Sequence, residues 1–172
     1  MRELGAKNSS LLEIGAGIRA LAERMRGCWN EFDDRSRDIT FGHDFTHSFI
    51  TVGFYDIICV FEVIKQLTLQ EAAEMLIKLR AHLKPGGLLI LTTPNTFYPP
   101  AYLRDATHVT PFCFDELAGL VSLAGYQVQF IYRLFHDSLL KKCVKRFLMY
   151  SLFRVLGIDY AKQVLVVAKT PL

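Results

Sequence analysis

The sequence predicts an α/β fold with a mostly parallel sheet, and three observations carry this expectation. Strand-like and helix-like patterns alternate along the 172 residues. Residues 55–61 form a nearly continuous run of β-branched and aromatic side chains, which is typical of a central parallel strand covered on both faces. A short apolar run near the amino end stops at closely spaced glycines, as a strand does when it enters a tight turn. Alternating strands and helices pack with the helices over a parallel sheet.

The composition predicts one globular domain spanning residues 1–172. A hydrophobic fraction of 51% with 22% charged residues excludes a disordered chain, and a net charge of +3 is too small to indicate a nucleic acid partner. Four widely spaced cysteines without a Cys-x-x-Cys pair predict neither a disulfide nor a zinc framework. The first residues contain no apolar signal segment, so we expect a cytoplasmic location.

The amino-terminal half begins with a strand, a helix and a second strand. Ser10–Ile14 is the short apolar run that stops at a glycine. Ile18–Arg26 has apolar residues at helical spacing and ends at the next glycine. Cys28–Phe32 follows as a strand that ends in the acidic pair Asp33 and Asp34. The residues from there to the central strand are polar and have no clear period.

The middle of the chain repeats the helix and strand pattern. Leu69–Leu83 has the apolar stripe of an amphipathic helix. The Lys-Pro-Gly-Gly sequence at residues 84–87 predicts the turn that ends it. Leu88–Thr93 is a further buried strand, residues 94–110 are predicted as a loop rich in proline and aromatic residues, and Pro111–Ala124 is predicted as a helix.

Two strands and a helical segment complete the predicted sheet. Tyr126–Arg133 and Gln163–Lys169 have strand patterns, and Ser138–Leu156 between them has a helical one. This connection allows the final strand to run antiparallel to its neighbours.

A glycine-rich turn, Glu13-Ile-Gly15-Ala-Gly17, joins the first strand to the first helix. Glycines let the backbone turn sharply and approach a ligand closely, and the start of the helix offers free N–H groups. Asp33 and Asp34 lie eighteen and nineteen positions after Gly15. A carboxylate about 20 residues after such a turn is placed to bind ribose hydroxyls. The alternative interpretation is an ordinary strand-to-helix turn without a ligand.

Three motifs together resemble the class I S-adenosylmethionine (SAM) methyltransferases, of the type 11 and type 12-like kind. They are Leu11–Gly17, Tyr55–Ile64 and Leu83–Leu91, and the resemblance spans residues 11–169. It implies a Rossmann-like, doubly wound sheet and a transferase that uses SAM as its cofactor. It also implies an acceptor that is a small molecule, a glycan or a lipid-linked molecule, since some similar enzymes act in glycan or lipid biosynthesis.

The same resemblance implies two groups of site residues. The residues expected to bind the cofactor are Glu13, Gly15, Ala16, Gly17, Asp33, Asp34, Asp44 and Phe61. The residues expected on the acceptor side, after the Pro-Asn turn at 94–95, are Asn95, Tyr98, Tyr102, Asp105 and His108. We expect His108 to act as a general base with Asp105 as its orienting partner. The alternative is that both residues only fix the loop and cap the next helix.

The sequence departs from the family pattern in its cofactor half. Only nine residues separate Asp34 from Asp44, too few for the usual second helix and third strand, so this half is expected to be shortened. Arg19 replaces a small residue of the glycine motif, and Lys65-Gln66 stand where relatives often have an acidic residue and a histidine. These departures favour an alternative function, a non-catalytic module of the same fold used for binding or assembly.

Two further segments have more than one interpretation. In residues 139–156, apolar side chains at helical spacing alternate with Lys141, Lys142, Lys145 and Arg146, which predicts either a helix over the sheet or a peripheral contact with an anionic membrane. His43 and His47 flank Asp44, but no helical spacing aligns them and no further ligands accompany them, so no metal site is predicted.

Overall fold

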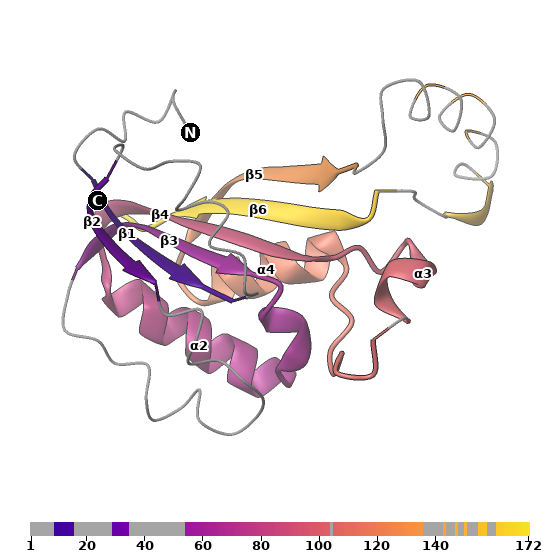
Figure 1. The fold of residues 1–172 in the computed structure, drawn as a ribbon, viewed down its shortest axis with the longest axis horizontal. Coiled ribbons are helices and arrows are strands. Elements are labelled where there is room, and N and C mark those ends of the chain that lie inside the picture. Colours follow the sequence, from indigo (N-terminus) through magenta and orange to yellow (C-terminus); the bar gives the residue numbers. More distant parts are fainter. Residues whose placement is uncertain are drawn as a thin grey trace.

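The computed structural model describes residues 9–15, 29–34, 54–103, 105–135, 143, 147, 150, 155–157 and 161–172. Within these residues, six strands form one sheet in the order β2-β1-β3-β4-β6-β5 (Figure 1). Their bounds are β1 Ser9–Ile14, β2 Trp29–Asp34, β3 Tyr55–Phe61, β4 Leu83–Pro94, β5 Gln127–Leu134 and β6 Gln163–Lys169. β1 to β4 are parallel, and β6 runs antiparallel to both β4 and β5. The predicted Rossmann-like class and its antiparallel final strand are therefore confirmed.

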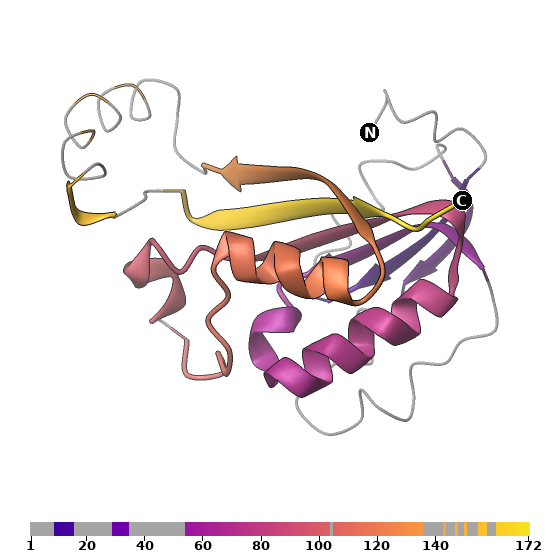
Figure 2. The ribbon, with the colours of Figure 1, turned by 180° about the vertical axis from the view of Figure 1, so that it is seen from behind.

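The described helices lie between the strands in the expected order. They are the 3-10 helix η3 Ile64–Gln66, α2 Leu69–Ala81, the short α3 Pro99–Tyr102 and α4 Phe114–Leu123. α2 begins at a capping box, in which the Thr68 hydroxyl accepts from the Glu71 N–H and the Glu71 carboxylate accepts from the Thr68 N–H. α2 and α4 cover the same face of the sheet (Figure 2).

The core lies between that face and the two helices. Because side chains alternate along a strand, Leu12, Ile58 and Leu89 point toward α2 and α4. Their neighbours Leu11, Ile57 and Cys59 belong to a smaller buried cluster on the opposite face. No helix in the described part of the chain is long and apolar enough to span a membrane.

The Lys-Pro-Gly-Gly segment differs from its prediction. It was expected as a turn before the strand, but β4 already begins at Leu83, which pairs with Tyr55, and the next pair is Leu88 with Ile57. Residues 84–87 are therefore an excursion inside the strand pairing. Gly86 supplies the positive φ of 71° that the excursion needs. This prediction was wrong because pairing at Leu83 depends on Tyr55, which a local pattern does not include.

A polar cluster fixes this excursion at the amino edge of the sheet. The Asp56 carboxylate accepts hydrogen bonds from the Ser10 N–H at 2.8 Å, the Ser10 hydroxyl at 2.9 Å and the Lys84 ammonium at 2.7 Å. Partial burial raises the pKa of the Asp56 carboxyl, but these hydrogen bonds outweigh burial and hold the pKa below its usual value. Asp56 thus joins β1, β3 and the start of β4.

Other boundaries shift by small amounts or lie outside the described residues. α3 forms within the predicted loop at 94–110, and β2 extends far enough to include Asp33 and Asp34. The predicted helix at Ile18–Arg26 and the segment at 35–53 lie outside the described residues. In the described sheet, β2 is an edge strand.

Candidate functional site

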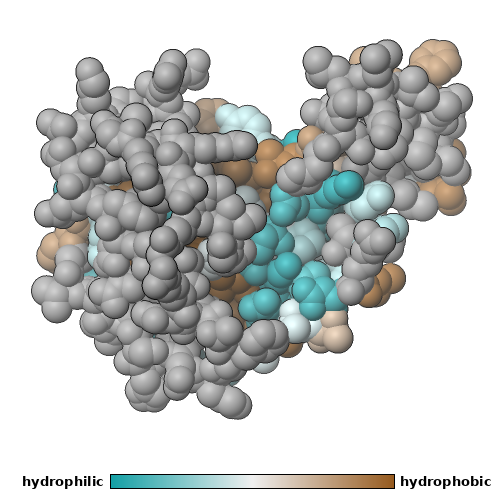
Figure 3. Space-filling view, in the orientation of Figure 1, coloured by the Kyte–Doolittle hydropathy of each residue, from teal (hydrophilic) through white to brown (hydrophobic). Residues whose placement is uncertain are grey.

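The candidate site lies at the carboxyl edge of the sheet, where the parallel strands end. Gly15 follows β1, Glu62 follows β3 and Asn95 follows β4. Antiparallel β6 begins at the same edge, because its first residue, Gln163, pairs with Pro94. In open α/β sheets, ligands bind at this edge. Hydrophilic side chains of the described residues gather here, between the sheet and the α3 segment (Figure 3).

Gly15, at the end of β1, packs closely against the end of β3. Its φ is +102°, and a Cβ at this position would lie 2.2 Å from the Phe61 carbonyl oxygen and 2.4 Å from Val63 Cγ2. Only glycine fits this conformation and this spacing. Gly15, the first glycine of the turn predicted to carry the cofactor, therefore contacts the residues at the end of β3.

Glu13 places a carboxylate in the sheet just before that turn. Glu13 is 2% exposed, and in the strand register it lies opposite Asp34 on β2 and Cys59 on β3. Burial raises the pKa of the Cys59 thiol, and the negative charge of Glu13 raises it further, so Cys59 stays a neutral apolar side chain. A buried carboxylate next to the close backbone turn at Gly15 fits a ligand that carries positive charge, as the sulfonium and amino groups of SAM do.

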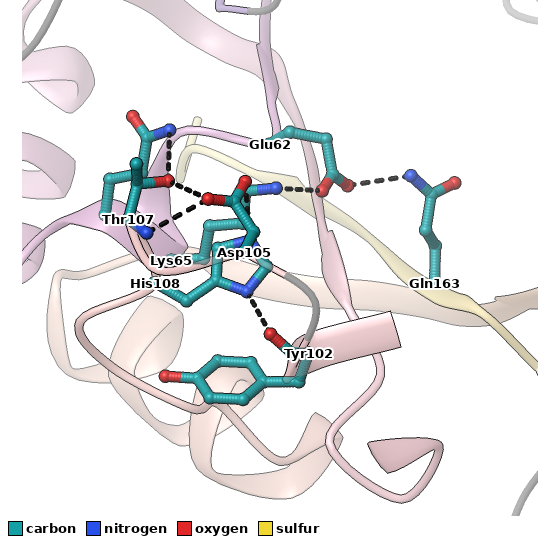
Figure 4. A network of polar contacts seen from close by, with 8 residues as sticks. Glu62, Lys65, Tyr102, Asp105, Thr107, His108 and Gln163 are labelled. Carbon is teal, nitrogen blue, oxygen red and sulfur yellow. Dashed lines mark hydrogen bonds and ion pairs between the residues drawn. The ribbon is translucent and has the colours of Figure 1, made fainter. Parts of the chain in front are cut away.

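Glu62 is the centre of a polar cluster that sequence analysis did not predict (Figure 4). One carboxylate oxygen accepts from Gln163 Nε2 at 2.9 Å, and the other pairs with Lys65 Nζ at 3.0 Å. The side chains of Glu62 and Lys65 are 18% and 12% exposed. Glu62 also has a φ of 60°, a left-handed conformation that few residues other than glycine adopt.

The loop between α3 and α4 brings Asp105 and His108 together, as predicted (Figure 4). Asp105 Oδ1 accepts from the Thr107 N–H at 3.0 Å and from the Thr107 hydroxyl at 2.7 Å. Hydrogen bonds from Thr107 are the main reason that the pKa of the Asp105 carboxyl lies below its usual value. Asp105 is thus an ionised group at the surface of this loop.

His108 lies behind Asp105. Its Nδ1 is 2.6 Å from the Tyr102 carbonyl oxygen and donates to it, because a carbonyl only accepts. Nε2 then faces Asp105 Oδ2 at 3.5 Å. The His108 side chain is 3% exposed and that of Asp105 is 46% exposed, so Asp105 is the member of the pair that an incoming molecule meets first.

The loop is attached to η3 through the backbone. The Lys65 carbonyl accepts from the N–H groups of Val109 at 2.8 Å and Thr110 at 3.1 Å. The Thr110 hydroxyl donates to the Leu67 carbonyl at 2.6 Å. These bonds place residues 105–110 beside the end of β3.

The other residues expected on the acceptor side have different surroundings. Asn95 is 2% exposed, its amide donates to the Ala161 carbonyl at 2.9 Å, and its oxygen accepts from the Phe97 N–H at 3.1 Å. Its side chain therefore fixes the turn after β4. Tyr102 packs its ring 4.9 Å from the His108 ring, and partial burial raises the pKa of its hydroxyl. Tyr98 follows the turn and is partly buried.

The structure brings only part of the expected cofactor residues into view. Gly15 contacts Phe61 at the carboxyl edge, where the Phe61 side chain packs against the smaller apolar cluster, and Glu13 pairs with Cys59, two residues before Phe61. Asp33 and Asp34 lie at the end of β2, and only their backbone is described. Ala16, Gly17, Asp44, His43 and His47 lie outside the described residues. The described residues contain no cluster of metal-ligating side chains.

Comparison with known proteins identifies the family. The family model described as a methyltransferase domain matches residues 1–130, which is more than half of the chain. A search among curated proteins gave no match.

Solved structures agree on the fold. A SAM-dependent methyltransferase from Archaeoglobus fulgidus is 15% identical and superposes with a TM-score of 0.73, over 98% of this chain and 90% of that chain. The N-methyltransferase NodS from Bradyrhizobium japonicum, in complex with S-adenosyl-L-homocysteine, is 16% identical with a TM-score of 0.65, over 98% and 82%. A Haloferax volcanii methyltransferase in complex with the activator Trm112 is 12% identical with a TM-score of 0.67, over 96% and 84%. The chain belongs to the methyltransferase family, which confirms the class predicted from the motifs, a SAM-dependent methyltransferase with a Rossmann-like fold.

Proposed function

We propose that this chain transfers the methyl group of SAM to a hydroxyl group of a small molecule or glycan, and that Asp105 and His108 receive the acceptor proton. The observation that carries the proposal is the order of the two side chains, with exposed Asp105 in front of buried His108 at the carboxyl edge. Family membership favours this enzymatic role over a non-catalytic binding module.

The cofactor side of the proposal rests on Glu13 and Gly15. When bound, SAM supplies an electrophilic methyl group on a sulfonium, with a neutral thioether as the leaving group. The turn at Gly15 would bring the backbone close to the cofactor, and the buried Glu13 carboxylate would balance the positive charge of the cofactor. Much of the rate enhancement then comes from holding donor and acceptor in line.

The acceptor side of the proposal concerns one proton. As the new carbon–oxygen bond forms, the acceptor O–H bond breaks and the proton leaves the oxygen. Asp105 would accept the hydrogen bond and then the proton from that hydroxyl, and would pass the proton to His108 Nε2, 3.5 Å from its Oδ2. The Nδ1 hydrogen bond to the Tyr102 carbonyl holds the imidazole in the tautomer whose Nε2 is free of a proton. Neither Nε2 nor the facing Asp105 oxygen carries a proton before the reaction, so the transferred proton would create the hydrogen bond between them.

Kinetics of the variants Asp105→Asn and His108→Gln test this assignment. The probe is SAM with a tritiated methyl group, offered with a panel of soluble glycans, phenols and amines. We expect each variant to lose roughly 10²- to 10⁴-fold in kcat while the Kd for S-adenosylhomocysteine changes by less than about twofold. Asp115→Asn, an exposed carboxylate in the first turn of α4, is the matched control and should keep full activity. Activity within a few-fold of wild type in both variants, or methylation of amine acceptors only, would overturn the assignment.

A lipid-linked acceptor is a second candidate, favoured by the exposed apolar residues of the segment at 139–156. Cys143, Phe147 and Tyr150 lie in helical conformation at spacings that place them on one side of a helix. Phe147 is 86% exposed and Tyr150 is 55% exposed, so neither packs on the sheet. The lysines and the arginine in the same part of the sequence suit an anionic membrane.

Vesicle binding tests this candidate. We expect the protein to sediment with vesicles of phosphatidylcholine and phosphatidylserine at 50 mM salt and to be released at 300 mM salt. Phe147→Ser should weaken the binding several-fold, whereas the exposed substitution Leu123→Ser on α4 should not. Equal binding to neutral vesicles, or none at low salt, would remove the membrane contact.

A further inference from the structure

Three segments of the site meet at the end of β3. Gly15 sits on Phe61 and Val63, the two neighbours of Glu62. Gln163, which begins β6, donates to the Glu62 carboxylate. Lys65 pairs with the same carboxylate, and its backbone carbonyl holds the loop at 105–110. Residues 61–65 therefore support the cofactor turn on one side and the acceptor loop on the other.

Glu62 has the most constrained position in this junction. A positive φ is unfavourable for a residue with a side chain, and it persists only where surrounding contacts impose it. Here, both carboxylate oxygens are bound within the fold, at 2.9 and 3.0 Å. Gln163 is 101 positions away in sequence, so the contact joins the end of β3 to the start of the last strand, β6. Because the backbone of residues 61–65 is held in this way, we expect a movement of Gly15 to displace Lys65 as well.

We infer that Glu62, with Lys65, is a positioning residue that couples cofactor binding to the placement of the acceptor loop. Occupation of the Gly15 turn presses on residues 61 and 63, and the carboxylate holds Lys65, which carries Val109 and Thr110, in a fixed place. The inference rests on the proposed function only in naming residues 105–110 as the acceptor side. Asp105 and His108 are tested separately above, so failure of either idea leaves the other in place.

Coupling of this kind has an observable signature that does not require the acceptor. In the wild-type protein, saturating S-adenosylhomocysteine should slow amide hydrogen exchange in peptides covering residues 105–110, because binding at one site stabilises the other. We expect at least a threefold slowing. The exchange of β5, which lies at the edge of the sheet and pairs with β6, serves as the internal reference.

Two single variants separate the backbone from the carboxylate. Glu62→Asn keeps a residue type that tolerates positive φ but is too short to reach both partners. Glu62→Gln keeps the length and loses the charge that pairs with Lys65. Both should abolish the slowing at 105–110 and weaken S-adenosylhomocysteine binding roughly tenfold, whereas Glu74→Gln on the exposed side of α2 should behave as wild type.

Exchanging the charges decides between coupling and general damage. Glu62→Lys and Lys65→Glu each place like charges together and should lose the slowing. The double variant restores an ion pair, and the Gln163 amide can turn to present its oxygen, so affinity should return to within about threefold of wild type together with the slowing. Equal slowing at 105–110 in the wild type and the single variants would overturn the inference. A double variant as impaired as the singles would also overturn it, because that result indicates damage to the fold.

Discussion

The two edges of the sheet hold their carboxylates in different ways. At the amino edge, Asp56 is bound by Ser10 and Lys84, which belong to β1 and β4. At the carboxyl edge, Glu62 is bound by Lys65 of η3 and by Gln163 at the start of β6, and Asp105 is bound by Thr107 of its own loop. The first cluster ties strands together, and the second ties together segments that surround a ligand site.

One family motif thus contains a residue expected to affect the stability of the fold and a residue expected to affect ligand affinity. Tyr55–Ile64 contains both Asp56 at one end of β3 and Glu62 just past the other. Strand contacts are made once and are retained in every state of the folded protein, whereas loop contacts can change when a ligand arrives. We therefore expect substitutions at the amino edge to lower the free energy of unfolding and leave ligand affinity unchanged. Substitutions at the carboxyl edge should affect affinity first.

The largest expected effect is that of Gly15→Ala at the carboxyl edge. A methyl group there collides with the Phe61 carbonyl and Val63 at a positive φ, so the turn must move. We expect calorimetry to show no measurable S-adenosylhomocysteine binding, and urea unfolding to show a loss of about 2–4 kcal/mol. Gly119→Ala is the matched control, because nothing lies within 4 Å of its added Cβ on α4. It should raise stability by up to about 1 kcal/mol without affecting binding. Normal binding by Gly15→Ala would contradict the assignment of this turn.

A smaller effect is expected for Asp56→Ala at the amino edge. The substitution leaves the Ser10 N–H without its acceptor at a position that is 7% exposed. The free energy of unfolding should fall by about 2 kcal/mol in urea titrations, and the Kd for S-adenosylhomocysteine should stay within twofold of wild type. Lys84→Met removes only one donor and should cost less. A large loss of affinity in Asp56→Ala would erase the distinction between the two edges.

The smallest effect is the pH dependence of the same contact. In the folded state the pKa of Asp56 lies below its usual value of 3.8. Between the folded and the usual pKa, the unfolded chain therefore binds more protons than the folded chain. The stability that Asp56 contributes is therefore fully present above the usual pKa and is lost as the pH falls through the lower, folded value. Unfolding free energies of wild type and Asp56→Asn should differ by a constant amount between pH 5 and 6 and converge below about pH 4. A constant difference down to pH 3 would contradict the assignment.

The loop between α3 and α4 shows how much of the candidate site could be predicted from the sequence. The resemblance to the methyltransferases predicted that Asp105 and His108 act together, and the structure places their side chains next to each other. Their relative exposure was not predictable, since it depends on Tyr102 and on the attachment to η3. Asn95 was expected to face the acceptor, and its contacts with Ala161 and Phe97 instead use its side chain inside the fold.

The sequence by itself determined the kind and order of the elements, because apolar periodicity and breaking residues act locally along the chain. It also determined the family, through three motifs that each lie within one strand and its turn. The tertiary structure alone decided the sheet order, the excursion at residues 84–87 and the junction at Glu62. These features arise from partners such as Ser10 with Asp56 and Glu62 with Gln163, which are 46 and 101 positions apart. Nothing in a local pattern encodes such pairs, because they form only when the strands have been brought side by side.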